Sequence, residues 1–409
     1  MSINKDMYSH TCLRLIHTIK WYLRHHQLNK IQDKEMKVLF LIFHGFNPAN
    51  GISKKIHYQV DGLKSCGIDT RLCYIDETTG RKLRMVDNNI LKDYGTGIKS
   101  KLLKRTEYSS IIEYAMKERI DFVYMRSDHN ANPFTIHMVH KLRKTGIKVV
   151  MEIPTYPYDK EYNSFQEKMT LFIDQCFRKI LAKQLCYIVT FSDYQTIFGR
   201  PTICISNGID FNHIPLKRHI NDTSHELHLI GVAEIHYWHG FDRLVMGLVN
   251  YYKSQPSYKV YFHIAGWFFG ERERNAILPI IKQHGLEEYI ILHGARHGKE
   301  LDDLFEQADM AIGSLARHRS GIIHIKTLKN REYAARGLSF IYSEIDSDFE
   351  DKPYILKAKA DESPIDIYQI IEFYKRQILS PMQIRNTILS LSWKNQMSKV
   401  LNLISPIHL

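Results

Sequence analysis

Short apolar runs alternate with amphipathic stretches along the chain from residue 36 onward. Residues 36–43 (MKVLFLIF) contain an apolar run of strand length at 38–43, and we predict a buried strand there, as is typical of a parallel sheet. Residues 51–66 continue with helical periodicity and end at Gly67. The alternation predicts further strands at 71–75, 122–125, 148–153, 187–190 and 202–205, and helices at 134–144 and 164–183. Such a pattern predicts βαβ units in a parallel sheet.

A second series of the same kind begins after residue 224. The polar, irregular residues 211–224 follow Asn207-Gly208-Ile209-Asp210, and we predict that they form an interdomain linker. The second series predicts strands at 227–233, 259–265, 289–293, 310–313 and 340–342, and helices at 241–252 and 276–284. We therefore expect an α/β protein with two doubly wound domains, at 36–210 and 225–385, and an amphipathic helix within 386–409. Ligands of such sheets bind outside the carboxyl ends of the strands, so we expect the site between the domains.

Residues 1–35 precede the first predicted strand and form a basic segment of helical character. One interpretation is a helix on an anionic membrane surface, and the other is an additional helix packed on the first domain. The segment does not resemble a secretory signal, because charged residues and histidines interrupt its apolar positions. No apolar run approaches the roughly 20 residues of a membrane-spanning helix. We expect a cytoplasmic protein, and the basic segment leaves open a location at the inner face of the cell membrane.

The sequence carries 56 Lys and Arg residues against 44 Asp and Glu, a formal net charge of +12. Such an excess favours nucleic acid, an anionic membrane or phosphorylated substrates as partners. The sequence has no zinc-finger spacing, aromatic RNP-like strand or basic heptad arm, so we expect no nucleic-acid partner. The phosphate groups of small molecules and lipids remain as the expected partners of the basic side chains.

Several passages resemble those of retaining GT-B glycosyltransferases of the group 1, or family 4-like, type found in bacterial capsule and cell-surface polysaccharide synthesis. These passages are FSDY at 191–194, ICISNGID at 203–210, GVA at 231–233, WHGFDR at 238–243, LKNREYAARG at 328–337 and EIPTYP at 152–157. Their order and spacing carry the resemblance from about residue 36 to the end. It implies two Rossmann-like domains facing across a cleft, an acceptor domain followed by a nucleotide-sugar donor domain. It also implies that the helix within 386–409 returns toward the first domain.

The resemblance implies a donor site on the second domain. Glu332 stands where the family has a glutamate that accepts hydrogen bonds from the ribose hydroxyls. The helix that begins near Leu328 offers backbone N–H groups to the diphosphate. His324 stands where the family has a second glutamate, which contacts the transferred sugar, so it is either a hydrogen-bonding partner of the sugar or a structural histidine. Backbone groups from Gly294 to Arg296 are expected to bind the base.

Glycosyltransferases of this type use no metal, so cationic side chains must stabilise the leaving diphosphate. Many relatives use an Arg and a Lys early in the second domain, where this sequence has Glu234 and His239. The remaining candidates are Arg243, Lys329 and His239, with Lys326 as a further one. We expect no metal and no cofactor beyond the nucleotide-sugar co-substrate.

Two spacings superficially suggest metal ligands. Asp346-Ser347-Asp348 has the D-x-D spacing, but it lies in an acidic loop after a predicted strand late in the second domain. His293 and His297 lack a third ligand, and glycines favour a loop around them. We therefore reject both as metal sites.

The acceptor is expected on the first domain, around Gly51, Arg126 to His129, Glu152 and Tyr156. Gly51 either lets the backbone approach a ligand or belongs to an ordinary turn. Lys54 and Lys55 either attract a phosphorylated acceptor or form a solvated helix face.

The resulting expectation is a hexosyltransferase that acts with retention and without metal, from a UDP- or GDP-sugar to a glycan or polyprenyl-linked acceptor. Capsule, lipopolysaccharide or other polysaccharide synthesis would be its setting. Two alternatives remain: a catalytically silent GT-B scaffold subunit of a glycan-assembly complex, which the substitutions at 234, 239 and 324 leave open, and a nucleotide-sugar 2-epimerase.

Overall fold

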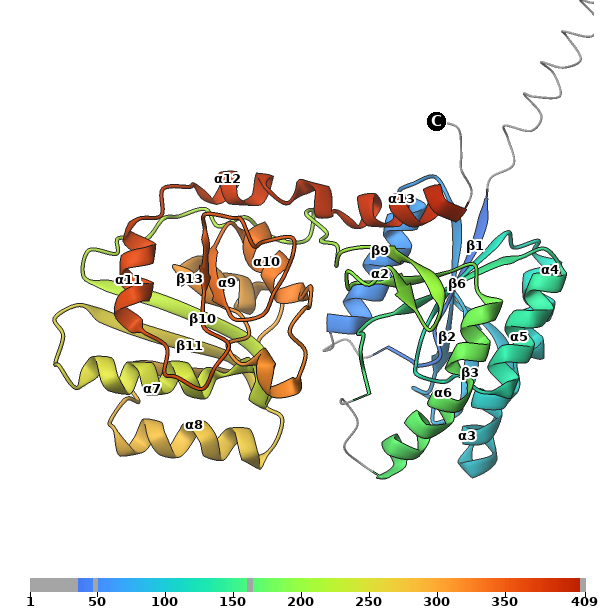
Figure 1. The fold of residues 1–409 in the computed structure, drawn as a ribbon, viewed down its shortest axis with the longest axis horizontal. Coiled ribbons are helices and arrows are strands. Elements are labelled where there is room, and N and C mark those ends of the chain that lie inside the picture. The colour runs from blue at the N-terminus through green and yellow to red at the C-terminus, as the bar shows by residue number, and fades with distance from the viewer. Residues whose placement is uncertain (1–35, 47–50, 160–164, 405–409) are drawn as a thin grey trace, which may run out of the picture.

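The computed structural model describes residues 36–46, 51–159 and 165–404, which form two α/β domains side by side (Figure 1). The first domain contains a nine-stranded sheet in the order β4-β3-β2-β1-β5-β6-β7-β9-β8, and the second a six-stranded sheet in the order β12-β11-β10-β13-β14-β15. The predicted α/β architecture with two doubly wound domains is confirmed. The predictions for 1–35 lie outside the described residues. Within the described ranges, no helix is long and apolar enough to cross a bilayer.

The first sheet has a parallel centre and antiparallel strands at both edges. Its strands are β1 (Lys37–Leu41), β2 (Asp69–Asp76), β3 (Leu83–Val86), β4 (Asn89–Asp93), β5 (Phe122–Arg126), β6 (Lys148–Ile153), β7 (Tyr187–Thr190), β8 (Thr196–Ile197) and β9 (Arg200–Cys204). Its helices are α2 (Gly51–Lys64), α3 (Gly97–Thr106), α4 (Ser109–Lys117), α5 (Pro133–Lys144) and α6 (Phe165–Gln184). The β3–β4 hairpin, α3 and α4 were not predicted. The side chains of β4 are mostly exposed, so this strand has no apolar alternation to detect.

The strand β1 is buried on both faces, as its unbroken apolar run predicts. Val38 and Phe40 belong to the core layer under α2 and α13 (Trp393–Ile404). Leu39 and Leu41 belong to the opposite layer, under α4, α5 and α6. Successive side chains of a strand point to opposite faces, so helices must cover both.

The second sheet is parallel throughout. Its strands are β10 (Glu226–Ile235), β11 (Lys259–Phe268), β12 (Ile290–Gly294), β13 (Met310–Ile312), β14 (Ser339–Tyr342) and β15 (Ile355–Lys357). The helices of this half are α7 (Phe241–Tyr252), α8 (Glu271–Gln283), α9 (Lys299–Gln307), α10 (Leu328–Arg336), α11 (Ile367–Lys375) and α12 (Pro381–Asn386).

The last described helix, α13, packs against α2 of the first domain (Figure 1). Two residues before α13 begins, the Leu391 carbonyl accepts a backbone hydrogen bond of 2.9 Å from Ile209 N–H. The Trp393 indole then lies on Gly208, in the NGID passage. A chain segment from the end of the sequence therefore covers the end of the first domain.

Gly208→Ala is expected to lower the free energy of unfolding by about 1–3 kcal/mol, because overpacking forces neighbouring groups to move. A Cβ atom at 208 would lie 2.4 Å from Cδ2 of Trp393. Urea unfolding of the purified variant measures the change. Gly51→Ala is the matched control, because a Cβ there would meet nothing within 4 Å. Equal stability of both variants would show that Trp393 does not require glycine at 208.

Candidate functional site

A cleft of about 310 Å³ lies between the two domains. One wall consists of the last residue of β5, residues that follow β6, β7 and β9, and Ile52 and Lys55 of α2. Residues that follow β10 and β13 or lie around the start of α10 line the other wall. Among the described residues that line it there is no Asp or Glu. The titratable side chains of the lining are instead five Lys or Arg, two His and one Tyr: Lys55, Arg126, Arg317, Lys326, Lys329, His239, His324 and Tyr156. The cleft is therefore built to attract an anion.

A buried carboxylate organises the first-domain wall. Glu152, at the end of β6, is fully buried and accepts hydrogen bonds from Tyr124 Oη (2.6 Å), Gln59 Nε2 (2.5 Å) and the Arg126 guanidinium. Lys55 Nζ lies 3.8 Å from it. Burial raises the pKa of Glu152, but Arg126 and Lys55 outweigh this effect and hold the pKa below its usual value. Glu152 thus stays ionised and holds two cations at the cleft.

Lys55 lies inside the cleft wall, whereas its neighbour Lys54 is exposed. The Lys55 ammonium sits 3.4 Å from the ring centroid of Phe191, a cation–π contact. Burial, with a smaller contribution from Arg126, lowers the pKa of Lys55 to about 7. The interpretation of this lysine pair as a solvated helix face therefore holds only for Lys54, because Lys55 lines the cleft.

On the second wall, Lys329 faces His239. Nδ1 of His239 accepts the backbone N–H of His236 at 2.9 Å, so the proton of the neutral ring must lie on Nε2. Nε2 lies 2.6 Å from Lys329 Nζ. Burial and the nearby Lys329 hold the pKa of His239 well below its usual value, so the ring is neutral. A hydrogen bond from Nε2–H requires an uncharged amine as the acceptor.

The charge state of Lys329 agrees with this hydrogen bond. Burial and the Arg317 guanidinium lower the pKa of Lys329 to about 7. Lys329 belongs to the first turn of α10, whose N-cap Thr327 accepts from Asn330 N–H. The remaining N–H groups of this turn and the positive end of the helix dipole lie at the cleft, where they favour an anion.

Of the other predicted donor-site residues, His324 and Leu328 line the cleft with Lys329, and Glu332 and Arg243 do not. Glu332 lies one turn along α10, is partly exposed, and forms an ion pair with Arg336 at 2.9 Å. Arg243 is buried in the second domain.

The Arg243 guanidinium is fully engaged within the second domain. It donates to the carbonyls of Ser363 (2.8 Å), Lys359 (3.0 Å) and Leu315, and it pairs with Asp361 at 3.1 Å. It thereby ties α7 to the loops after β13 and β15.

The remaining predicted residues are divided between the two domains. Tyr156 lines the cleft, and Gly51 is the first residue of α2, next to Ile52 of the cleft lining. Gly294 ends β12, and Arg296 pairs with Glu300 at 3.4 Å. Both are exposed and lie outside the cleft lining.

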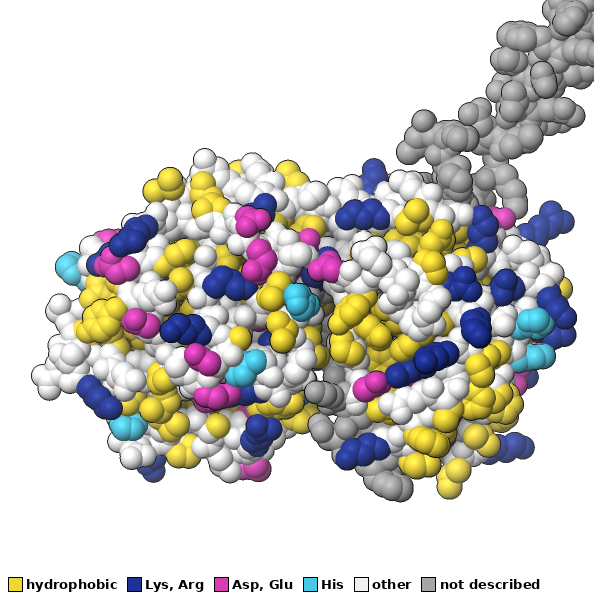
Figure 2. Space-filling model, viewed as in Figure 1, with side chains coloured by type: hydrophobic (Ala, Val, Ile, Leu, Met, Phe, Trp, Pro, Cys, Tyr) yellow, Lys and Arg dark blue, Asp and Glu magenta, His cyan; other side chains and the backbone are white. Residues whose placement is uncertain are grey.

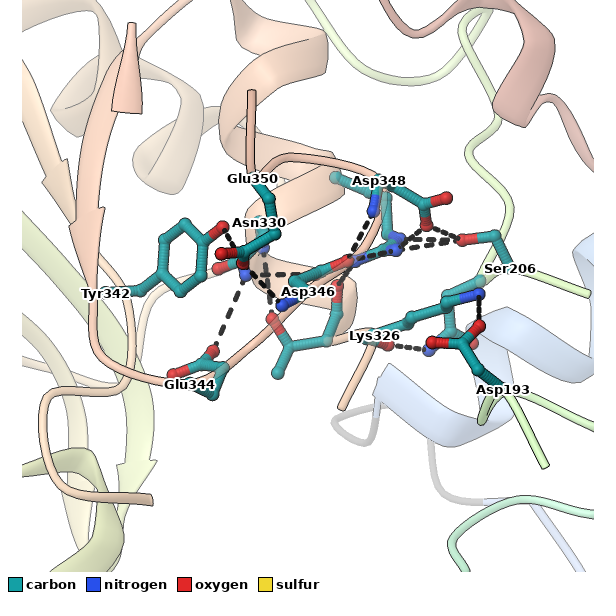
Figure 3. A network of polar contacts seen from close by, with 12 residues as sticks. Asp193, Ser206, Lys326, Asn330, Tyr342, Glu344, Asp346, Asp348 and Glu350 are labelled. Carbon is teal, nitrogen blue, oxygen red and sulfur yellow. Dashed lines mark hydrogen bonds and ion pairs between the residues drawn. The ribbon is translucent and has the colours of Figure 1, made fainter. Parts of the chain in front are cut away.

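The D-x-D spacing belongs to a buried ion-pair network (Figure 3). The fully buried Arg331 guanidinium donates to Asp346, also fully buried, and to Asp348. Ser206 of the first domain also contacts this guanidinium, 2.9 Å from Nη2. Both aspartates therefore hold an arginine that joins the two domains.

A second polar link crosses between the domains near the same place (Figure 3). Lys326 Nζ pairs with Asp193 Oδ1 at 2.9 Å, and Asn207 Nδ2 donates to the Lys326 carbonyl. The loop before α10, which lines the cleft, is thus tied to the first domain.

No protein-family model and no curated protein matches the chain. Solved structures match nearly all of it. HepE from Anabaena, in complex with UDP and glucose, has a TM-score of 0.58 and 14% identity over 91% of this chain and 100% of that one. Sucrose-phosphate synthase from Thermosynechococcus elongatus has a TM-score of 0.52 and 12% identity over 90% and 95% of the two chains. The pneumococcal O-GlcNAc transferase GtfA, in complex with UDP and GlcNAc, has a TM-score of 0.53 and 11% identity over 90% and 98%.

The chain has the GT-B fold.

The sequence analysis missed one residue of the cleft lining of this GT-B chain, Arg317, and one buried carboxyl group outside that lining, Glu344. Arg317 follows β13 directly, so its position beyond a strand's carboxyl end was a usable signal. Glu344 is buried beside Asn330, 3.5 Å away, and burial raises the pKa of this carboxyl to about 7. Only the packing of β14 against α10 brings Glu344 there, so the sequence offered no signal for it.

Proposed function

We propose that this GT-B protein is a glycosyltransferase that uses a nucleotide-sugar donor. The observation that carries the proposal is the convergence of five Lys and Arg side chains, without a carboxylate among the described lining residues, in the cleft where α10 begins. Departure of a nucleoside diphosphate places negative charge there, and preorganised cations and helix N–H groups stabilise such charge. The complexes of HepE with UDP-glucose and of GtfA with UDP and GlcNAc support UDP-sugars as the first donors to test.

Four of the five Lys and Arg side chains, together with His239, have proposed roles; the fifth, Lys326, pairs with Asp193. The diphosphate contacts Lys329, Arg317 and the Nε2–H of His239. When it binds, these contacts replace the hydrogen bond between Lys329 and His239. Arg126 and Lys55, held by Glu152, face them across the cleft and contact the acceptor or the donor phosphate. These positions support a reaction in which side-chain cations perform the work that a metal performs elsewhere.

The uncharged groups complete the proposed donor site. His324 contacts the transferred sugar, and Glu332 accepts from the ribose hydroxyls after exchanging its contact with Arg336. Backbone groups at 294–296 bind the base. The acceptor lies along the first-domain wall near Tyr156 and Gly51.

The finer assignment rests on the motif resemblance. We propose transfer of a hexosyl group with retention at the anomeric carbon, to a glycan or polyprenyl-linked acceptor in surface polysaccharide synthesis. The passages at 203–210 and 328–337 support it.

Donor binding is expected to take up a proton between about pH 7 and pH 9, and affinity is expected to fall about tenfold per pH unit within this range. In the empty cleft Lys329 has a pKa of about 7 and is uncharged above it. A bound diphosphate favours the ammonium form and raises this pKa, so the lysine must gain a proton on binding. Calorimetric titration of UDP-glucose in two buffers with different ionisation enthalpies measures the uptake. Lys329→Arg should reduce the uptake, because arginine keeps its charge throughout this range. Any remaining uptake is expected from Lys55, whose pKa is also about 7; unchanged uptake would assign the proton to another group.

A donor screen tests the function. Nucleoside diphosphate release is measured from a panel of UDP-, GDP- and other nucleotide-sugars, with EDTA, and with and without membrane-lipid extract. Release from one donor that EDTA leaves intact and Glu332→Ala abolishes would support a metal-independent transferase. Absence of release from every donor, together with no nucleotide binding in calorimetry, would reject the donor site and favour a scaffold role.

A further inference from the structure

Three neighbouring helices of the first domain present apolar side chains to solvent. The helices α3, α5 and α6 pack side by side on one face of the sheet (Figure 1). On α6 the exposed large apolar residues follow a helical repeat along one side: Met169, Phe172, Ile173 and Ile180, each 44–61% exposed. Ile98 and Leu102 of α3 are 86% and 63% exposed, and Phe134 of α5 is 50% exposed. Solitary exposed apolar residues are ordinary, but seven on one helical layer indicate an interaction surface.

The exposed charged side chains that the structure describes on α3, α5 and α6 all have one sign. The exposed charged side chains of the described parts of α3, α5 and α6 are cations without exception: Lys99, Lys101, Arg105, Lys141, Arg143, Lys144, Lys168, Lys179 and Lys183. Of the two carboxylates of these helices, Asp174 is buried and accepts from Tyr158 Oη at 2.6 Å, and the side chain of Glu167 lies outside the part of α6 whose side chains are described. By contrast, α9 of the second domain exposes Glu300 and Asp303 beside Lys299. The basic surface is thus a local feature.

Figure 2 shows this combination over the lower part of the first domain, where α3, α5 and α6 lie: hydrophobic and Lys or Arg side chains alternate there, with few Asp or Glu. We propose that the outer face of α3, α5 and α6 docks on an anionic lipid bilayer. Apolar side chains enter the region between headgroups and acyl chains, and the surrounding lysines and arginines contact the lipid phosphates.

The mixture of side chains selects this occupant over others. A nucleic acid would complement the cations but not the exposed Phe172, Ile173 and Leu102. Residues 1–35 of the chain carry six Lys and Arg against three Asp and Glu, so their charge does not complement the face. An anionic bilayer complements both kinds of side chain.

The docking face is placed to serve the cleft. The helix α6 follows the loop that carries Tyr156, a residue of the cleft lining. A lipid-linked acceptor in the bilayer would therefore approach the first-domain wall. The docking itself does not depend on the proposed function, because vesicle binding is measured without a donor.

Flotation of the full-length protein with vesicles tests the proposal. Binding is expected to vesicles of phosphatidylcholine with phosphatidylglycerol and not to phosphatidylcholine alone. The double variant Phe172→Ser/Ile173→Ser should lower the partition coefficient about tenfold or more, because two apolar side chains no longer enter the bilayer. Ile378→Ser is the matched control; Ile378 is 89% exposed but lies outside this face, and its variant should bind as the wild type does.

Charge variants separate the face from the N-terminal segment. Replacing Lys141, Arg143 and Lys144 by glutamine should lower the partition coefficient about fivefold for each charge removed. The matched triple variant Arg14→Gln/Lys20→Gln/Arg24→Gln should have a smaller effect. Equal binding to neutral vesicles, no binding to either vesicle, or loss only in the N-terminal variant would overturn the proposal. Tighter binding to a DNA duplex than to anionic vesicles, unchanged in the Phe172/Ile173 variant, would also overturn it. Nucleoside diphosphate release from a soluble donor is measured in parallel with the same variants. It shows whether the donor reaction fails independently of vesicle binding.

Discussion

Lys329→Ala is expected to lower nucleoside diphosphate release about 10²- to 10³-fold, the loss typical of removing one preorganised group that stabilises developing charge. The lysine lies at the start of α10 and lines the cleft, and its one hydrogen-bond partner among the described residues is the neutral His239, at 2.6 Å. No carboxylate competes with an incoming diphosphate for it within hydrogen-bond distance among the described residues. Steady-state release from the donor that the screen identifies measures the effect.

Two variants control this experiment. Lys299→Ala removes an 85% exposed lysine side chain of the same domain, and its activity should equal that of the wild type. Lys329→Arg keeps the charge but not the size, so it should retain more activity than the alanine variant. If Lys329→Ala releases nucleoside diphosphate at the wild-type rate, the diphosphate does not bind at the start of α10.

Asp346→Ala is expected to lower the free energy of unfolding by about 3–5 kcal/mol, because it leaves a buried arginine without its main counter-ion. Arg331 and Asp346 have no exposed side-chain surface, and Arg331 also joins Asp348 and Ser206. The same substitution loosens the link between the domains. Urea unfolding, followed by circular dichroism, measures the loss.

Asp351→Ala removes an exposed aspartate of the same loop and should change the free energy of unfolding by less than about 0.5 kcal/mol. In the double variant Arg331→Met/Asp346→Leu, apolar groups replace both members of the pair, so much of the stability should return. An Asp346→Ala protein as stable as Asp351→Ala would mean that Arg331 reaches solvent or finds another partner.

Much of the fold follows from local sequence patterns. The unbroken apolar run at 38–43 predicts a strand that is covered on both faces. The repeated alternation beyond 224 predicts a second sheet of the same kind. Periodicity reports whether one face or both faces of an element are buried, so it identifies strongly patterned elements. It fails for β4, because an exposed edge strand has no apolar face, and it left the helices around it undetected.

The sequence also identified Lys329, His239, His324 and Tyr156, which the structure brings to one cleft. Only the tertiary structure decided which further charges join them. Lys55 and Arg126 lie about 70 residues apart in sequence, and they meet because β5 and β6 are neighbours and Glu152 at the end of β6 attracts both. A carboxylate holds cations only where strand order places them within a few ångströms, since Coulomb energy depends on distance and local dielectric.

Tertiary contacts also give different surroundings to residues that look alike in the sequence. Arg243 and Arg331 are both arginines of helices in the resembling passages, yet packing encloses one in backbone carbonyls and the other in aspartates of a D-x-D spacing. Gly208 in the NGID passage meets its steric partner, Trp393, from the far end of the chain. Sequence patterns determine which elements form because helix and strand periodicity are local. Which polar groups converge, and whether a charge meets solvent, ligand or counter-ion, is decided by contacts between residues far apart in the sequence.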